Sequence, residues 1–93
     1  MENNFQLKGL EISETIIKLA KQNEIYKKFI GKCWLKFLIK DFGPYGRILK
    51  NKLIAKYYSS ELDQWVYIIA EPNNQGAYNK MITFKEFLKM EIF

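Results

Sequence analysis

The chain contains no histidine, and its 93 residues include only one cysteine, two prolines and one arginine. Without histidine it lacks the commonest general base near neutral pH, every Ser–His or Cys–His nucleophile pair and every zinc site built on imidazole. The single cysteine, Cys33, can form neither an intramolecular disulfide nor a cysteine-rich metal centre. We therefore expect a protein that is not an enzyme, with no catalytic residue, no cofactor and no metal site.

Long apolar runs are also missing. The longest, Trp65–Ala70, is far shorter than the ~20 residues that a membrane-spanning helix needs. The first nine residues include Glu2 and carry no apolar segment of the kind found in signal peptides. We expect a cytoplasmic protein in a reducing compartment, with no membrane partner.

Large apolar side chains are abundant: 48% of the residues are hydrophobic, including 7 Phe, 6 Tyr and 2 Trp. This composition can fill a core and excludes an intrinsically disordered chain. A length of 93 residues is enough for one compact domain and too short for two. We expect a single domain over residues 1–93.

A 3.6-residue period predicts an amphipathic helix over residues 14–30. Ser13 precedes it in the N-cap position, and Gly31 follows it where a left-handed residue commonly ends a helix. The positions expected to face the core are Ile16, Leu19, Ala20, Tyr26 and Ile30. Residues 1–10 are interpreted as an arm or a short strand, and the pattern does not choose between the two.

From Lys32 onward the period changes to two, which predicts a sheet over residues 32–82. In its first strand, residues 32–40, Cys33 faces inward and Trp34 outward. The later segments are a turn over 43–46, a strand over 48–58, a strand over 64–71, a loop over 72–76 and a strand over 77–82. The first two strands are expected to pair as a long antiparallel hairpin.

A closing helix over residues 84–91 has a complete start signal. Thr83 and Glu86 have the spacing of a capping box, in which each side chain satisfies a free backbone N–H of the other residue. The helical period places Phe84, Phe87 and Leu88 on the inward side.

These elements predict a small α+β domain with the order α–β–β–β–β–α. Its antiparallel sheet has three or four strands, and the two helices cover one face. An SH3-like curled barrel is an alternative arrangement of the same strands. The order also resembles that of double-stranded-RNA-binding domains, but the lysine cluster of those domains is reduced here to Lys85, beside Glu86.

Positive charge is concentrated in residues 32–58, where seven basic residues face one acidic residue, a net +6 in a chain of net +5. Since 14 of the 15 basic residues are lysines, contact with phosphates that is indifferent to sequence is favoured over base reading by arginine. The alternation gathers basic and aromatic side chains on one outward face. The residues predicted to bind are Trp34, Lys36, Lys40, Arg47, Lys50, Lys52, Lys56 and Tyr58.

Lysines interleaved with aromatic rings are typical of nucleic-acid surfaces, because the ammonium groups attract phosphates and the rings stack on bases. The first hypothesis is therefore a non-enzymatic protein that engages nucleic acid or a nucleoprotein complex. The lysine-rich composition of this small chain resembles phage and mobile-element inhibitors of host defence, such as anti-CRISPR proteins. The alternative is a protein-interaction module or homodimer, in which the lysines merely solvate a sheet face.

Two further groups of residues have structural interpretations. Glu61 and Asp63 are expected to serve turn chemistry rather than a metal ion. Trp65, Tyr67 and Ile69 form a stripe at strand spacing, which is interpreted as core, with a dimer contact on the opposite sheet face as the alternative.

Overall fold

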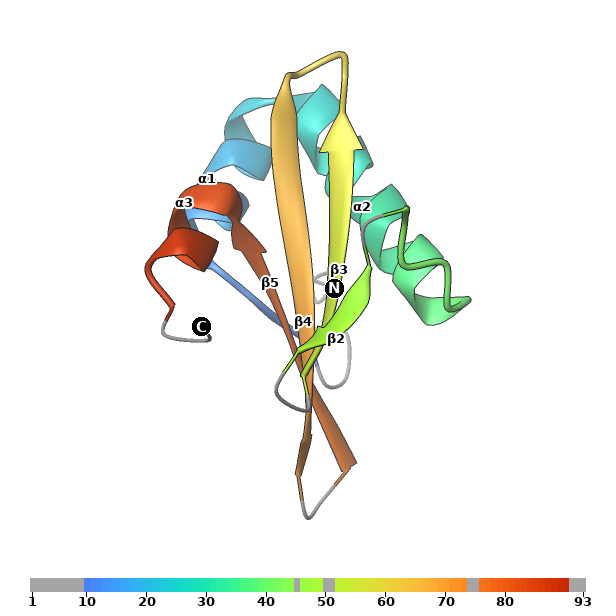
Figure 1. Ribbon diagram of the computed structural model, residues 1–93. Coiled ribbons are helices and arrows are strands. Elements are labelled where there is room, and N and C mark those ends of the chain that lie inside the picture. Colours follow the sequence, from blue (N-terminus) through green and yellow to red (C-terminus); the bar gives the residue numbers. More distant parts are fainter. Residues whose placement is uncertain (1–9, 45, 50–51, 74–75, 91–93) are drawn as a thin grey trace.

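A five-stranded mixed sheet with the strand order β1-β5-β4-β3-β2 forms the centre of the fold (Figure 1). The computed structural model describes residues 10–44, 46–49, 52–73 and 76–90. In chain order the elements are β1 (Leu10–Ile12), α1 (Glu14–Gln22), α2 (Glu24–Leu38), β2 (Arg47–Leu49), β3 (Lys52–Ser59), β4 (Gln64–Asn73), β5 (Gly76–Thr83) and α3 (Phe84–Leu88).

The predicted α+β class is confirmed, whereas the predicted sheet is wrong in two respects. It has five strands, and β1 pairs with β5 in parallel while the other neighbours are antiparallel. Because β1 and β2 lie at opposite ends of the strand order, the sheet is open and not an SH3-like barrel. Of the predicted arm or strand at residues 1–10, Leu10 belongs to β1, and residues 1–9 lie outside the described residues.

The single helix predicted over residues 14–30 is two helices that meet at Asn23. Ser13 caps α1 as expected, accepting a hydrogen bond from the Ile16 N–H at 3.2 Å. Asn23 leaves helical geometry, with φ −142° and ψ 112°, and its Oδ1 accepts hydrogen bonds from the N–H groups of Ile25 and Tyr26. Asparagine is a strong N-cap because its short side chain satisfies these otherwise unpaired donors, so a new helix begins here.

The strand predicted over residues 32–40 is wrong, because α2 continues through Gly31 to Leu38. Cys33 and Trp34 are consecutive and both are buried. On a strand, consecutive side chains point to opposite faces, whereas on a helix they share a broad inward stripe. The glycine weakens the helix by about 1 kcal/mol relative to alanine, and the burial of its neighbours outweighs that cost.

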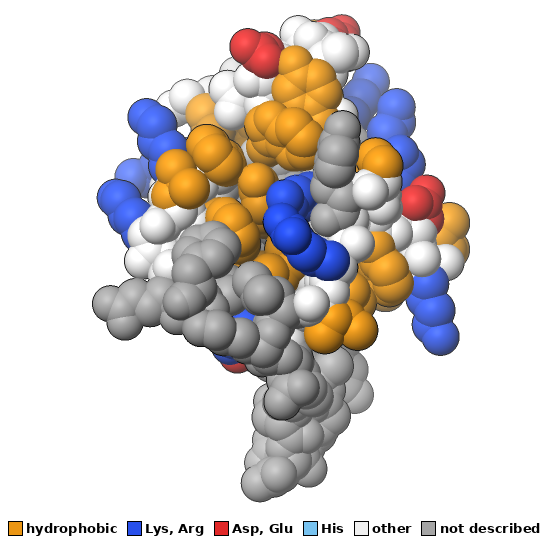
Figure 2. All heavy atoms as spheres, in the orientation of Figure 1, with side chains coloured by type: hydrophobic (Ala, Val, Ile, Leu, Met, Phe, Trp, Pro, Cys, Tyr) orange, Lys and Arg blue, Asp and Glu red, His pale blue; other side chains and the backbone are white. Residues whose placement is uncertain are grey.

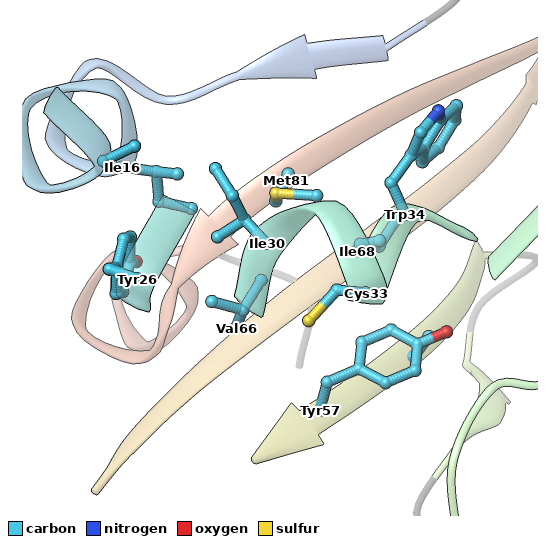
Figure 3. Packing of buried hydrophobic residues seen from close by; sticks show 11 residues of the cluster. Ile16, Tyr26, Ile30, Cys33, Trp34, Tyr57, Val66, Ile68 and Met81 are labelled. Atoms are coloured by element: carbon cyan, nitrogen blue, oxygen red, sulfur yellow. The ribbon is translucent and has the colours of Figure 1, made fainter. Parts of the chain in front are cut away.

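The sheet separates two apolar clusters. The larger joins α1 and α2 to one face, and Figure 3 shows Ile30, Cys33 and Trp34 of α2 packed over Val66 and Ile68 of β4. On the other face, Phe87 of α3 packs against the second cluster. The expectation that both helices cover one face is therefore wrong.

The later strands follow the sequence pattern closely. β4 and β5 pair from Val66↔Thr83 to Asn73↔Gly76, so both extend into the predicted 72–76 loop, of which residues 74 and 75 lie outside the described residues. The strand predicted over 48–58 is divided into β2 and β3, which pair antiparallel. The partners of β3 are thus β2 and β4, and not residues 32–40.

The capping box that opens α3 is confirmed. The Thr83 N–H donates to Glu86 Oε1 at 2.9 Å, and the Glu86 N–H donates to Thr83 Oγ1 at 3.2 Å. Burial opposes ionisation of Glu86, but hydrogen bonds from Thr83, Ser13 and Thr15 outweigh it and lower the pKa of the carboxyl. Phe87 is buried as expected, whereas Phe84 and Leu88 are exposed.

Candidate functional site

Of the eight predicted binding residues, three are set apart by burial, by position or by an ion pair. Trp34 packs in the larger core cluster. Lys40 follows the end of α2 as an exposed residue with a positive φ of 65°. Lys52 forms an ion pair with Glu71, with a distance of 2.6 Å between Nζ and Oε2. Lys50 lies outside the described residues.

Three of the predicted residues, Lys36, Lys56 and Tyr58, line one solvent-open groove of about 520 Å³. We call it the α2–β3 groove, because α2 forms one wall and β3 the other. Its lining residues are Phe29, Lys32, Cys33, Lys36, Gly43, Pro44, Lys56, Tyr57, Tyr58, Ser59, Ser60, Glu61 and Trp65. The structure thus brings together side chains that the predicted hairpin also placed together, but from a helix and a strand.

The groove follows the part of β3 that β2 does not cover. In the described residues, β2 pairs with Lys52–Ile54 only, whereas β4 pairs with β3 as far as Ser59. Gly43 and Pro44, in the loop after α2, also line the groove. Gly43 has φ +78°, and a Cβ built on it would lie 2.6 Å from the Lys56 carbonyl oxygen, so this close approach requires glycine. The Tyr57 hydroxyl donates to the Asp41 carbonyl oxygen at 2.8 Å and holds the loop against β3.

Three lysines follow one another along the helix wall. Lys28, Lys32 and Lys36 are four residues apart on α2, and all three are exposed. At about 1.5 Å per residue, neighbouring members of this lysine row are about 6 Å apart along the helix axis. A second hollow of about 310 Å³, lined by Lys28 and Lys32, extends the α2–β3 groove toward the start of α2. Like charges at this spacing destabilise a helix by about 0.2–0.5 kcal/mol per pair, so helix stability does not explain the row.

An aromatic pair stands on the sheet wall. Tyr58 and Trp65 are cross-strand partners whose ring centroids are 5.0 Å apart, at an interplanar angle of 46°. The Tyr58 hydroxyl donates to Asp63 Oδ1 at 2.6 Å. This hydrogen bond raises the pKa of Tyr58, so the phenol keeps its proton over the ordinary pH range.

The aromatic series continues across the sheet face that carries α3. Figure 2 shows hydrophobic side chains gathered over β3, β4 and α3, with basic side chains between them. The Lys56 Nζ lies 5.8 Å from the centroid of the Tyr67 ring. Arg47 is the cross-strand partner of Ile54, whose side chain belongs to the same cluster as Tyr67, so Arg47 lies on this face of the sheet. Burial raises the pKa of Tyr67, and the positive charge of Arg47 opposes that rise. Lys56 thus stands at the boundary between the groove and this aromatic face.

Acidic groups are present at the β3–β4 turn. Glu61 lines the groove and Asp63 holds the Tyr58 hydroxyl. Asp63 has a positive φ of 52°, a turn conformation that aspartate tolerates, and its carboxylate accepts a hydrogen bond from Tyr58 of β3. In the described ranges, no group of three or more His, Cys, Asp or Glu side chains is arranged to hold a metal ion.

Cys33 forms part of the floor of the groove but is only 1% exposed. Burial raises the pKa of its thiol to about 12. The thiol therefore remains protonated at neutral pH, and the thiolate that would act as a nucleophile is not populated.

Lys28, Lys32 and Trp65 were not among the predicted binding residues. The four-residue spacing of the lysines is visible in the sequence, but it becomes meaningful only once α2 is known to reach Leu38. Trp65 was interpreted as core because it shares a stripe with Tyr67 and Ile69. Those two are buried, whereas Trp65 is only partly buried at the end of the stripe.

Comparisons with known proteins add no relative: no family model, no curated protein and no solved structure matches this chain. Among the described residues, no helix is long and apolar enough to cross a membrane. A functional proposal therefore depends on the groove's own chemistry.

Proposed function

We propose that the α2–β3 groove binds nucleic acid without reading its sequence. The observation that supports this most strongly is that Lys32 and Lys36 of α2, Lys56 of β3 and the aromatic pair of Tyr58 and Trp65 all line one groove. Ammonium groups attract phosphates, and exposed aromatic rings accept any base on their faces.

The proposed indifference to sequence follows from the type of basic residue. A lysine presents a point charge on a flexible stem, whereas arginine presents the planar fork that matches a guanine edge or a phosphate. The groove's basic lining residues are all lysines, and the chain's one arginine, Arg47, lies on the neighbouring sheet face. The narrower hypothesis of a host-defence inhibitor stays a prediction from composition.

The salt dependence of binding tests the proposal directly. We expect the affinity for a fluorescently labelled oligonucleotide, measured by anisotropy, to fall linearly on a double-logarithmic plot against salt. Four phosphate contacts, to the lysine row and Lys56, correspond to a slope of about −3 for a single strand, or a loss of roughly 50-fold between about 50 and about 200 mM salt. An affinity that does not change with salt would contradict the proposal.

A second candidate function rests on an apolar patch at the end of α2. Leu35, Leu38 and Ile39 are 63%, 56% and 74% exposed, and their spacing places them on one side of the helix. Grouped exposed apolar side chains are typical of protein contacts. This patch favours the alternative of a protein-interaction module or homodimer.

If the patch joins two copies of the chain, replacing Leu35 and Ile39 together by serine should convert a dimer into a monomer. Light scattering behind a sizing column would measure the mass at several concentrations and at low and high salt. A wild-type mass of one chain at every concentration would remove the homodimer from consideration. The same double variant should leave the oligonucleotide affinity unchanged, since neither residue lines the groove.

A further inference from the structure

Building on the proposed function, we infer that the ligand of the α2–β3 groove is a single-stranded nucleic acid, with a base stacked on Tyr58 and Trp65 and the phosphates along α2. Stacking needs a base whose face is free. In a duplex the neighbouring base pairs cover the base faces, and for this reason aromatic side chains recognise single strands and splayed bases. Tyr58 is 46% exposed and forms, with Trp65, a pair that opens onto the groove.

The distribution of charge fits one backbone rather than two. The lysine row supplies a line of three ammonium groups, about 12 Å from Lys28 to Lys36 along the helix axis. The sheet wall of the groove contributes one lysine, Lys56. Its other lining residues include aromatic rings, serines and Glu61. A duplex would bring a second phosphate strand against this side, where the Glu61 carboxylate repels it. A single strand can keep its phosphates on the helix side and its bases on the sheet side.

The aromatic pair is held in place before any ligand arrives. The hydrogen bond from the Tyr58 hydroxyl to Asp63 Oδ1, at 2.6 Å, fixes the phenol end of the ring. Asp63 occupies a left-handed conformation, with φ 52°, which aspartate tolerates better than most residues. Ordering the ring in advance lowers the entropy lost when a base stacks on it. Asp63 is therefore a positioning residue for Tyr58.

Three probes of equal length separate the contributions of bases and backbone: oligothymidylate, an abasic deoxyribose-phosphate oligomer and a blunt-ended duplex. We expect the wild-type protein to bind oligothymidylate more tightly than either of the others. Tyr58→Ala should weaken oligothymidylate binding by roughly 5- to 150-fold, the range for loss of one stacked base, and leave binding of the abasic oligomer unchanged.

Two control variants isolate stacking from other effects. Tyr58→Phe keeps the ring but loses the hydrogen bond to Asp63, so it should weaken oligothymidylate binding by less than Tyr58→Ala does. Phe84→Leu removes an exposed ring on α3 that does not line the groove, so it should leave the affinity for oligothymidylate unchanged. Trp65→Leu removes the second ring but retains apolar packing, and thermal unfolding by circular dichroism reports whether that variant is folded.

The outcomes distinguish the inference from the function on which it rests. Equal affinity for all three probes, tighter binding of the duplex, or no effect of Tyr58→Ala would overturn the single-strand inference and leave nucleic-acid binding in place. If none of the three probes binds at low salt, the proposed function itself fails.

Discussion

Reversing the charge of Lys32, Lys36 and Lys56 together, by Lys→Glu substitution, should weaken oligonucleotide binding by about 100-fold near 0.1 M salt. Each phosphate contact to a single strand contributes about 0.7 to the salt exponent, so three lost contacts remove about two powers of ten at this concentration. All three side chains line the α2–β3 groove. Fluorescence anisotropy with oligothymidylate measures the effect, and the slope against salt should also become shallower by about 2.

A matched variant separates the groove from the charge of the whole molecule. Lys18, Lys21 and Lys85 are exposed lysines of α1 and α3 that do not line the groove. Their reversal to glutamate changes the net charge from +5 to −1, as does the groove variant, because each reversal removes two units. We expect this control to retain most of the affinity. Equal losses in both variants would mean that the overall charge attracts the ligand and the groove does not bind it.

Trp34→Ala should destabilise the fold by about 3–5 kcal/mol, the usual cost of removing a large buried ring. Trp34 is only 7% exposed, and its ring stacks on Phe37 with centroids 5.8 Å apart. Since domains of this size are stable by about 5–15 kcal/mol, the loss is a large part of the total. Urea unfolding followed by far-UV circular dichroism measures it. Where Trp34→Ala is too unstable to purify, Trp34→Phe should show a smaller loss in the same direction.

Leu38→Ala on the same helix is the control for this experiment. Leu38 is 56% exposed, so its truncation should change the free energy of unfolding by no more than about 0.5 kcal/mol. If the two alanine variants lost equal stability, Trp34 would not be a core residue. The predicted outward position of Trp34 on a strand would then regain support.

Local signals were sufficient for part of the fold. The capping box at Thr83 and Glu86 and the alternation of β4 identified their elements, because the hydrogen bonds and side-chain faces involved are set by residues close in sequence. The parallel pairing of β1 with β5 joins residues such as Leu10 and Asn79, which are far apart in the chain. No local pattern encodes that contact.

Residues 32–40 were predicted as a strand because their apolar positions fit both a two-residue and a 3.6-residue period. Cys33, Leu35 and Phe37 alternate as in a strand, but Ile30, Cys33 and Phe37 also fit a helical stripe. Gly31 has the features of a helix end, and this favours the strand interpretation for the residues that follow it. The packing of α2 on the sheet resolves the ambiguity, since Leu35 is exposed and Cys33 is buried.

The site was predictable to the extent that it depends on alternation within β3. Lys56 and Tyr58 lie on one face of that strand, as the two-residue period requires. Lys52 shares this face, but a carboxylate 19 residues later in the chain, that of Glu71, neutralises it. The lysine row could not be combined with Lys56 from the sequence, because the helix and the strand meet only in the folded chain.

The indole N–H signals of the two tryptophans provide the most direct test that the groove is the binding site. In a nitrogen–proton correlation spectrum titrated with oligothymidylate, the Trp65 signal should shift, because its ring lines the groove. The Trp34 signal should stay in place, because its ring is buried in the core on the α2 side of the sheet. Saturating binding that leaves the Trp65 signal unmoved would contradict the account.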